Sequence, residues 1–406
     1  MRGRDDHPNI PTHRGGATLP SGAGMTSRHA PLLACSARMP SGVAAVRKCQ
    51  GLRGIGMIRK TLVVTFALGC LSMATSALAE DAPKPPVITD PIYTKPVRLV
   101  DVGNGRRINL YCRGKGSPAV IFDSGLSDWT AAWALVQPTI SKKNTTCSYD
   151  RAGLGFSDAA TRPSTASNDV DDIHKALQVA HIKPPYILVG HSAAGMAVRV
   201  FADRYRDEVV GMVIVDGSHE DQSSRMKAIA TPEAQAHWDD GSNDTTCVDA
   251  AKGGEIAKDS PVYKKCVGEP YELYSKAIND VVLNYSAKLK YQAAVASERQ
   301  SFYGVSGDQT RATRRDFGDM PIIVLTHAPS PLAKNMTPQE HAQRTIEWEQ
   351  MHNEVAAMST HGINEIVPRA GHLIQYDRPE IVIDAIRQAL TIAAEQASGE
   401  PTPATK

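Results

Sequence analysis

The segment YILVGHSAAGMAVRVFADRY, residues 186–205, changes from a continuous apolar run to a helical pattern at a single serine. Its first five residues are typical of a buried strand, and the alanine-rich stretch after Ser192 has the spacing of an amphipathic helix. The residues nearest the serine are small: Gly190, Ala194 and Gly195. A sharp turn from strand to helix exposes a hydroxyl above a sheet and places backbone N–H groups beside it. The segment therefore predicts that Ser192 is a nucleophile, which needs a base to take its proton.

Strands and helices alternate on both sides of this segment. The predicted strands are VRLVDVG (97–103), RRINLYCRG (106–114), PAVIFDSG (118–125), TTCSYD (145–150), YILVG (186–190), VVGMVIVDG (209–217), MPIIVLT (320–326) and GINEIVPRAG (362–371). The first two strands form a hairpin, and the continuous apolar runs among the others favour parallel strands covered on both faces. This alternation predicts an α/β fold with a mostly parallel sheet of about eight strands.

One block interrupts the alternation. Residues 217–319 contain no apolar strand and are polar and helix-prone. We expect them to form an inserted helical cap, or lid, over the carboxyl edge of the sheet, where open α/β folds bind ligands. The core would then consist of residues 80–216 and 320–396, followed by a disordered tail at 397–406.

The first residues differ from the rest. Residues 1–56 lack helical or strand periodicity and are interpreted as a disordered or mis-assigned leader. Residues 57–79 begin with Met-Ile-Arg-Lys, continue with an apolar stretch and end in Ala-Leu-Ala, which is the order of a secretory signal peptide. We expect a periplasmic or secreted protein that begins at Glu80, with an uncleaved anchor or lipidation at Cys70 as alternatives.

Composition limits the partners. The chain has 406 residues and a formal net charge of +2, with acidic and basic residues intermixed. Neither a nucleic-acid surface nor a polybasic membrane patch is indicated, and the expected partner is a small molecule. Removal of the signal peptide would leave Cys112, Cys147, Cys247 and Cys266, an even number that favours disulfides after export, with four buried thiols as the alternative. The absence of a Cys-x-x-Cys pair argues against a zinc site.

Several motifs resemble those of the α/β-hydrolase superfamily, from about Val97 to Ala394. In chain order they are FDSG (122–125), YDRAGLGFSD (149–158), GHSAAG (190–195) and AGHLIQYDRPEIVIDAI (370–386). Alanine stands at position 194, where the family's nucleophile turn usually has glycine, and Ser124 stands where a histidine is more usual. Each motif alone is weak, but their order and their strand–loop–helix context are specific.

This resemblance implies roles for individual residues. Ser192 would be the nucleophile and His372 the general base. The backbone N–H groups of Leu126 and Ala193 would form the oxyanion hole. The YDRAGLGFSD loop would have a structural role.

The acid that completes such a triad is less obvious from the motifs. In most of the superfamily it follows the next-to-last strand, but that loop contains no Asp or Glu before Glu340. Asp216 ends the strand that comes next after the nucleophile's helix, and some branches of the superfamily carry their acid there. Parallel neighbouring strands would place Asp216 and Ser192 on one edge. Glu220 and Asp221 are the alternatives, and Asp216 would then only cap its strand.

The strand order of the superfamily also implies a cysteine pairing. Its second and fourth strands are neighbours, so Cys112 and Cys147 would form a cross-strand disulfide. Cys247 and Cys266 would pair within the lid and brace a segment with little core of its own.

The predicted function is hydrolysis of a carboxylic ester through an acyl-enzyme on Ser192, without a metal or an organic cofactor. Serine at this position argues against dehalogenase or epoxide hydrolase chemistry, which needs a carboxylate. An aminopeptidase or amidase with Glu269, Glu272 or Asp280 holding an amine remains an alternative. A perhydrolase, a C–C bond hydrolase and a non-catalytic binding protein are further alternatives.

Overall fold

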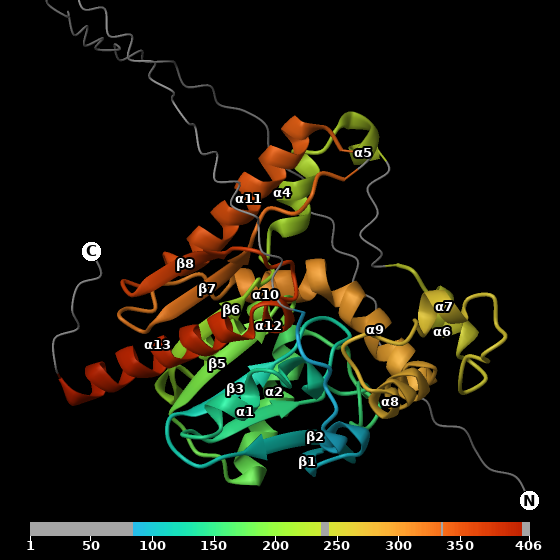
Figure 1. The fold of residues 1–406 in the computed structure, drawn as a ribbon, viewed down its shortest axis with the longest axis horizontal. Coiled ribbons are helices and arrows are strands. Elements are labelled where there is room, and N and C mark those ends of the chain that lie inside the picture. The colour runs from blue at the N-terminus through green and yellow to red at the C-terminus, as the bar shows by residue number, and fades with distance from the viewer. Residues whose placement is uncertain (1–83, 237–242, 334–335, 400–406) are drawn as a thin grey trace, which may run out of the picture. The chain divides into compact units, whose positions relative to one another are not determined.

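The computed structural model describes residues 84–236, 243–333 and 336–399. Its eight-stranded sheet has the order β1-β2-β4-β3-β5-β6-β7-β8, which confirms the predicted fold class (Figure 1). The pairs β1–β2 and β2–β4 are antiparallel, and the other neighbours are parallel. The strands are β1 (Leu99–Gly103), β2 (Arg106–Arg113), β3 (Ala119–Asp123), β4 (Thr146–Tyr149), β5 (Tyr186–His191), β6 (Val209–Val215), β7 (Ile322–His327) and β8 (Gly362–Val367).

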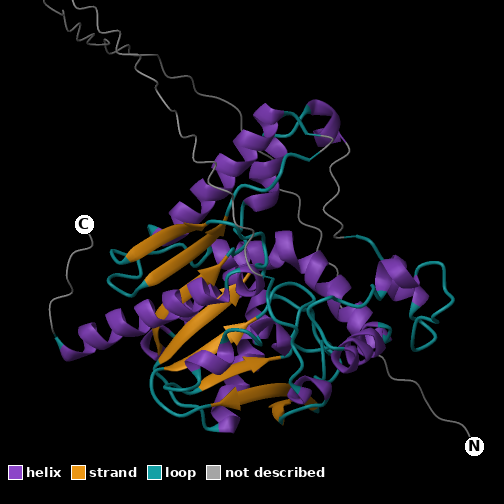
Figure 2. Cartoon of the chain, viewed as in Figure 1, coloured by secondary structure: helices purple, strands orange, loops and turns teal. Residues whose placement is uncertain are grey.

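Helices cover both faces of the sheet (Figure 2). One apolar cluster joins the sheet to α2 (Ala166–Ala180), α3 (Ala194–Arg204) and the end of α11 (Pro338–Ala356). A second joins the opposite face to α1 (Gln137–Ile140) and α13 (Pro379–Ser398). The remaining short elements of the core are η1 (Pro91–Thr94), η2 (Thr130–Trp133), η3 (Arg206–Glu208) and α12 (Ile374–Asp377). Burial on both faces explains why β5 and β6 are apolar without alternation.

Residues 217–319, here called the inserted segment, connect β6 to β7 through helices. These are α4 (Gln222–Ala228), α5 (Pro232–Ala236), α6 (Thr246–Ala250), α7 (Tyr263–Cys266), α8 (Lys276–Ser286), α9 (Leu289–Ser301), the π-helical turn η4 (Phe302–Ser306) and α10 (Gly307–Arg311). Helices α6 to α9 lie on one side of the strands, whereas α4 and α5 lie beside α11 (Figure 1). The inserted segment is thus divided between two places.

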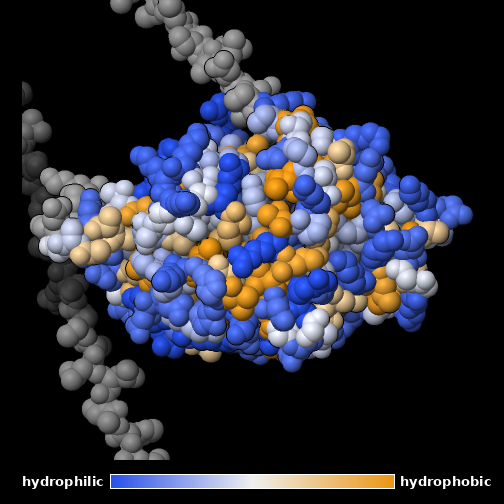
Figure 3. Space-filling view, turned by 90° about the horizontal axis from the view of Figure 1, so that it is seen from below, coloured by the Kyte–Doolittle hydropathy of each residue, from blue (hydrophilic) through white to orange (hydrophobic). Residues whose placement is uncertain are grey.

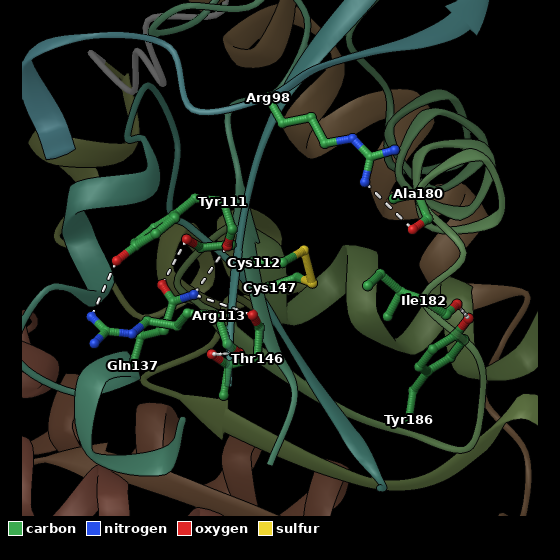
Figure 4. The surroundings of a disulfide bond; sticks show 11 residues. Arg98, Tyr111, Cys112, Arg113, Gln137, Thr146, Cys147, Ala180, Ile182 and Tyr186 are labelled. Atoms are coloured by element: carbon green, nitrogen blue, oxygen red, sulfur yellow. Dashed lines mark hydrogen bonds between the residues drawn. A yellow bond between two sulfur atoms is a disulfide. The ribbon is translucent and has the colours of Figure 1, made fainter. Parts of the chain in front are cut away.

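Both predicted disulfides are present, the one that the superfamily's strand order implied and the one between the two remaining cysteines. Cys112 and Cys147 lie opposite each other on β2 and β4 and form a disulfide (Figure 4). Cys247 and Cys266 join α6 to α7. The first disulfide reinforces the antiparallel side of the sheet, and the second closes a loop within the inserted segment.

The ends of the chain differ in how far the structure describes them. The predicted leader at 1–56 and the predicted signal peptide at 57–79 lie outside the described residues. Helix α13 continues to Ser398, so the predicted tail at 397–406 begins two residues too early, and 400–406 are not described. No helix among the described residues is long and apolar enough to cross a membrane. On the face in Figure 3, apolar residues form patches among hydrophilic ones.

Register brings two strand ends together. His191 of β5 pairs with Val215 of β6, so the residue after each strand, Ser192 and Asp216, emerges at the same edge. Both have positive φ angles, 53° and 46°, in the left-handed region that non-glycine residues rarely adopt. Positive φ at both ends turns the chain sharply away from the sheet and leaves both side chains at its carboxyl edge.

Candidate active site

The turn at Ser192 depends on small residues around it. A Cβ atom at Gly190 would lie 2.7 Å from the carbonyl oxygen of Ala194, and one at Gly195 would lie 2.8 Å from Cα of Gly217. Glycine is therefore required at 190 and 195, where backbone approaches backbone. Ala194 is 3% exposed and has room for its methyl group, so alanine is accepted where the superfamily usually has glycine.

A continuous hydrogen-bonded chain joins three of the predicted residues. His372 Nε2 lies 2.9 Å from Ser192 Oγ, and His372 Nδ1 lies 2.5 Å from Asp216 Oδ2. Ser192 follows β5, Asp216 follows β6, and His372 lies between β8 and α12. Ser192 and His372, 180 residues apart in the chain, are thus within the distance of a proton transfer.

Asp216 is fully buried and has more partners than the sequence predicted. His327 Nδ1, at the end of β7, lies 2.8 Å from both of its carboxylate oxygens, and Trp348 Nε1 of α11 donates a hydrogen bond to Oδ1. Burial alone would raise the pKa of Asp216. Hydrogen bonds from His327 and then from His372 outweigh burial and hold this pKa well below its usual value. Asp216 also raises the pKa of His327 by accepting its hydrogen bond.

His191 precedes Ser192 in the chain and is hydrogen-bonded to the backbone of His372. It is buried, and its Nε2 donates a hydrogen bond of 2.9 Å to the carbonyl oxygen of His372. Burial and the neighbouring His372 lower the pKa of His191 to about 3, so its ring is neutral. The contact holds the backbone of His372 in place beside Ser192.

Arg151 fixes the loop that contains Leu126. Its guanidinium donates hydrogen bonds of 2.5 and 2.6 Å to the carbonyl oxygens of Ser124 and Gly125. Because a trans peptide bond points its C=O and N–H in opposite directions, the N–H of Leu126 points away from Arg151. Within the described parts of the chain, neither this N–H nor that of Ala193 donates a hydrogen bond to a protein acceptor.

The inserted segment also reaches this loop. Glu298 of α9 forms a buried ion pair with Arg151, at 2.7 Å, and accepts a hydrogen bond from the N–H of Ser127. Tyr291 of the same helix donates its hydroxyl to the carbonyl oxygen of Ser127. Helix α9 and the YDRAGLGFSD loop therefore hold the same stretch of backbone, which agrees with a structural role for that loop.

A cavity of about 460 Å³ opens beside Ser192 and His372. Its walls include six large aromatic residues and one acid: Trp129, Tyr271, Tyr274, Tyr285, Tyr291, Tyr376 and Asp128. Four of these tyrosines belong to the inserted segment, and Tyr376 belongs to α12. This volume is in the range of small-molecule sites.

The alternative acids are engaged elsewhere. Glu220 is buried between Arg199 and Arg314, and Asp221 pairs with Arg311 and Arg314. Within the described residues neither forms a hydrogen bond or an ion pair with His372, whereas Asp216 does. The acids of the inserted segment that were considered for an amine are also engaged elsewhere or exposed: Glu269 pairs with Lys264, Asp280 pairs with Lys276, and Glu272 is exposed. In the described ranges no group of three or more His, Cys, Asp or Glu side chains is placed to hold a metal ion.

The sheet topology and the strand-to-helix turn at Ser192 define an α/β protein of the hydrolase class. A model of the alpha/beta hydrolase family matches residues 120–385, and the chain belongs to this family.

Curated relatives share parts of the chain. The Bacillus subtilis protein YqjL is 21% identical over 70% of this chain and 88% of its own length. A 2-(acetamidomethylene)succinate hydrolase from Mesorhizobium japonicum is 32% identical over 29% of this chain and 42% of its length. A proposed transporter from Hormonema carpetanum is 38% identical, but the match spans 32% of this chain and 19% of that protein.

Solved structures share the fold. A proposed epoxide hydrolase from Pseudomonas aeruginosa superimposes with a TM-score of 0.54 at 16% identity, covering 73% of this chain and 96% of that one. A proposed α/β hydrolase from Nostoc gives 0.55 at 15% identity, covering 72% and 97%. At these identities the likeness concerns the fold alone.

Proposed function

We propose that this protein is a serine hydrolase that cleaves carboxylic esters through an acyl-enzyme on Ser192. The observation that carries the proposal is the hydrogen-bonded chain from Ser192 Oγ through both nitrogens of His372 to Asp216. A base on the hydroxyl and a carboxylate behind the base are the two features that make a serine reactive.

In the first half of the reaction, His372 Nε2 accepts the proton of Ser192 while Oγ attacks the ester carbonyl carbon. The bond to the leaving oxygen then breaks, and the alcohol departs with the proton from His372. In the second half, His372 deprotonates water, which attacks the acyl group, and Ser192 leaves with the proton. Asp216 keeps Nδ1 protonated and stabilises the imidazolium in both halves.

The developing oxyanion needs donors in place before the reaction. The N–H groups of Leu126 and Ala193 are proposed as these donors. Ala193 follows Ser192 directly in the chain. Leu126 follows Gly125, which lies close to Ser192 in space, because a Cβ atom at Gly125 would lie 3.1 Å from Cβ of Ser192. Arg151 fixes the Gly125–Leu126 peptide, so its N–H needs no reorientation during the reaction.

Serine at position 192 supports acyl transfer over epoxide opening, which needs a carboxylate nucleophile. We further propose that the inserted segment is the lid of the site, because its tyrosines line the cavity beside Ser192. Export to an oxidising compartment is proposed from the residues at 57–79 and is supported by two disulfides.

The test is covalent labelling with a fluorophosphonate probe, combined with hydrolysis of p-nitrophenyl esters of graded acyl length. We expect one labelled site at Ser192 and, in Ser192→Ala, no label and a fall in kcat on the order of 10⁴-fold or more. Ser224→Ala is a matched control, because Ser224 is exposed and its hydroxyl bonds only to Asp221 of its own helix turn. Undiminished labelling of Ser192→Ala would overturn the proposal.

A further inference from the structure

One carboxylate in the wall of the cavity has no role in the mechanism above. Asp128 follows the proposed oxyanion loop and lines the same cavity as Ser192 and His372. Its carboxylate accepts a hydrogen bond of 2.9 Å from the N–H of Trp129, the residue next to it. Among the described residues, no Lys, Arg or His forms an ion pair with it. Asp128 is thus a partly buried acid whose one hydrogen bond to the described part of the chain comes from the neighbouring residue.

The surroundings of Asp128 disfavour its ionised form. Burial raises the pKa of Asp128 to about 6, and the hydrogen bond from Trp129 and the more distant Arg151 offset this only in part. The nearby Asp150 and Glu298 raise the pKa further. A positive charge brought into the cavity would reverse this penalty, because an opposite charge favours the ionised carboxylate.

The rest of the wall is suited to a cation. Trp129 packs edge-on against Tyr274 and Tyr285, with ring centroids 6.3 and 5.5 Å apart. Tyr271 lies 5.3 Å from Tyr274 and 5.9 Å from the ring of Tyr376. Aromatic faces attract ammonium groups through their quadrupoles, and the attraction grows when the cation is removed from water.

Two of these tyrosine hydroxyl groups form hydrogen bonds within the wall of the cavity. Tyr274 and Tyr376 share a hydrogen bond of 2.9 Å between their hydroxyl oxygens, and Tyr376 donates to the carbonyl oxygen of Ala131. These bonds fix the ring positions around the cavity without introducing a charge. Asp128 therefore remains the charged group that the aromatic wall leaves without a counter-ion.

We propose that Asp128 and the aromatic rings around it bind an organic ammonium group of the substrate, so that the preferred esters are cationic. The inference rests on the proposed function and specifies its substrate class. The ammonium group takes no part in bond making: the acyl group still passes to Ser192 and then to water. Its contribution is to place the ester carbonyl beside Ser192 in a cavity of about 460 Å³.

The test compares acetylcholine with 3,3-dimethylbutyl acetate, which replaces the trimethylammonium group by an uncharged tert-butyl group of the same shape. We expect kcat/KM to favour the cationic ester by about 300-fold, with about 30-fold from a desolvated cation–aromatic contact and about tenfold from the carboxylate of Asp128. In Asp128→Asn this ratio should fall at least tenfold. Asp280→Asn is the matched control, since Asp280 is an exposed acid of the inserted segment that pairs with Lys276, and its ratio should equal that of the wild type.

A second measurement does not depend on turnover. Tetramethylammonium should bind the folded Ser192→Ala protein by calorimetry at pH 8 and bind more weakly at pH 5, where Asp128 is protonated. The other titratable and charged groups around Asp128 and in the same cavity wall are Arg151, Asp150, Glu298, His191, His372, Tyr271, Tyr274, Tyr285, Tyr291 and Tyr376.

The outcomes separate the two proposals. Equal kcat/KM for the two esters, with Ser192 still labelled by the fluorophosphonate, would overturn the ammonium site and leave the hydrolase standing. Absence of labelling would overturn the hydrolase itself. A ratio that is unchanged in Asp128→Asn would assign any cation preference to the rings and overturn the role of Asp128.

Discussion

Two aspartates lie on either side of His372, and folding shifts the pKa values of their carboxyl groups in opposite directions. Behind the imidazole, Asp216 is fully buried, and hydrogen bonds from His327 and then from His372 hold its pKa well below the usual value. Trp348 donates a further hydrogen bond to the same carboxylate. In the cavity wall in front, Asp128 is less buried, yet its pKa is raised to about 6.

The difference shows that burial does not by itself decide the charge of a carboxylate. Burial raises the pKa in both places, and the number and charge of the donors decide whether that rise survives. Asp216 is supplied with partners by three elements of the core, whereas Asp128 has one peptide N–H. In the proposed mechanism the first carboxylate stabilises the imidazolium that forms during the reaction, and in the proposed substrate site the second pairs with a cation that arrives with the ligand.

The largest expected effect comes from breaking the region behind the imidazole. Asp216→Asn should lower kcat for p-nitrophenyl acetate by about 10⁴-fold, because an amide favours the wrong tautomer of His372. Steady-state kinetics with thermal unfolding of the same sample would check this. A loss below tenfold in a folded protein would move the acid's role to another residue.

A smaller effect is expected when Asp128, in the cavity wall, is replaced and the free energy of unfolding is measured. The pKa of Asp128 rises from 3.8 to about 6 on folding, so its contribution destabilises the protein as pH rises through this interval. Asp128→Asn should therefore increase the free energy of unfolding at pH 8 by about 2–3 kcal/mol, and the gain should vanish near pH 4. Urea unfolding at both pH values measures it.

Asp216 is the internal reference for this prediction. Its pKa is lowered on folding, so the stability it contributes is present above its unfolded pKa, near 4, and is lost as pH falls below that value. The two aspartates thus give opposite slopes of stability against pH. A lower free energy of unfolding for Asp128→Asn than for the wild type at pH 8 would contradict this comparison.

Removal of one donor from Asp216 should have a more modest effect. His327→Gln should cost about 1.5 kcal/mol at pH 6, since His372 and Trp348 still donate to the carboxylate. The pKa of His327 is raised by Asp216, so its contribution is complete below its unfolded pKa, near 6.5, and declines as pH rises through the folded value. Urea midpoints at pH 6 and pH 9 should show a smaller difference from wild type at pH 9.

The smallest effect on the free energy of unfolding is expected for an exposed acid far from both aspartates in the sequence, Glu269. The Glu269 side chain is 63% exposed and pairs with Lys264 at the surface. Glu269→Gln should change the free energy of unfolding by less than about 0.5 kcal/mol, because solvent screens such pairs. A larger change in the urea midpoint would show that exposed acids of the inserted segment have partners beyond this lysine.

Much of the fold could be predicted from local patterns. Apolar runs, the turn between the first two strands and the context of the motifs indicate the eight strands of the described sheet, and motif order places Ser192 and His372 at one edge. Asp216 followed from the absence of acids after β7 and from the register of neighbouring parallel strands. Helix α11 was not predicted, since its sequence is largely polar, although Thr337 with Glu340 is a capping-box pattern that indicates its start.

The partners of the two aspartates could not be predicted in this way. His327 ends β7, next to β6, which was a usable signal, but two imidazoles on one carboxylate depend on side-chain rotamers. The isolation of Asp128 depends on where the tyrosines of the inserted segment settle. Helix α9, which bears Tyr291, has little apolar periodicity, and its placement follows from contacts between distant parts of the chain.

The ion pair between Arg151 and Glu298 has a consequence for protein engineering. Specificity is commonly redesigned by exchanging the cap of one enzyme for that of a homologue while leaving the core intact. Here a transplanted segment that lacks an acid at position 298 would remove one of the two carboxylates that pair with the buried Arg151, leaving Asp123, and would loosen the peptide that Arg151 orients. Chimeras of this protein should retain that glutamate, or swap both members together, if turnover is to survive the graft.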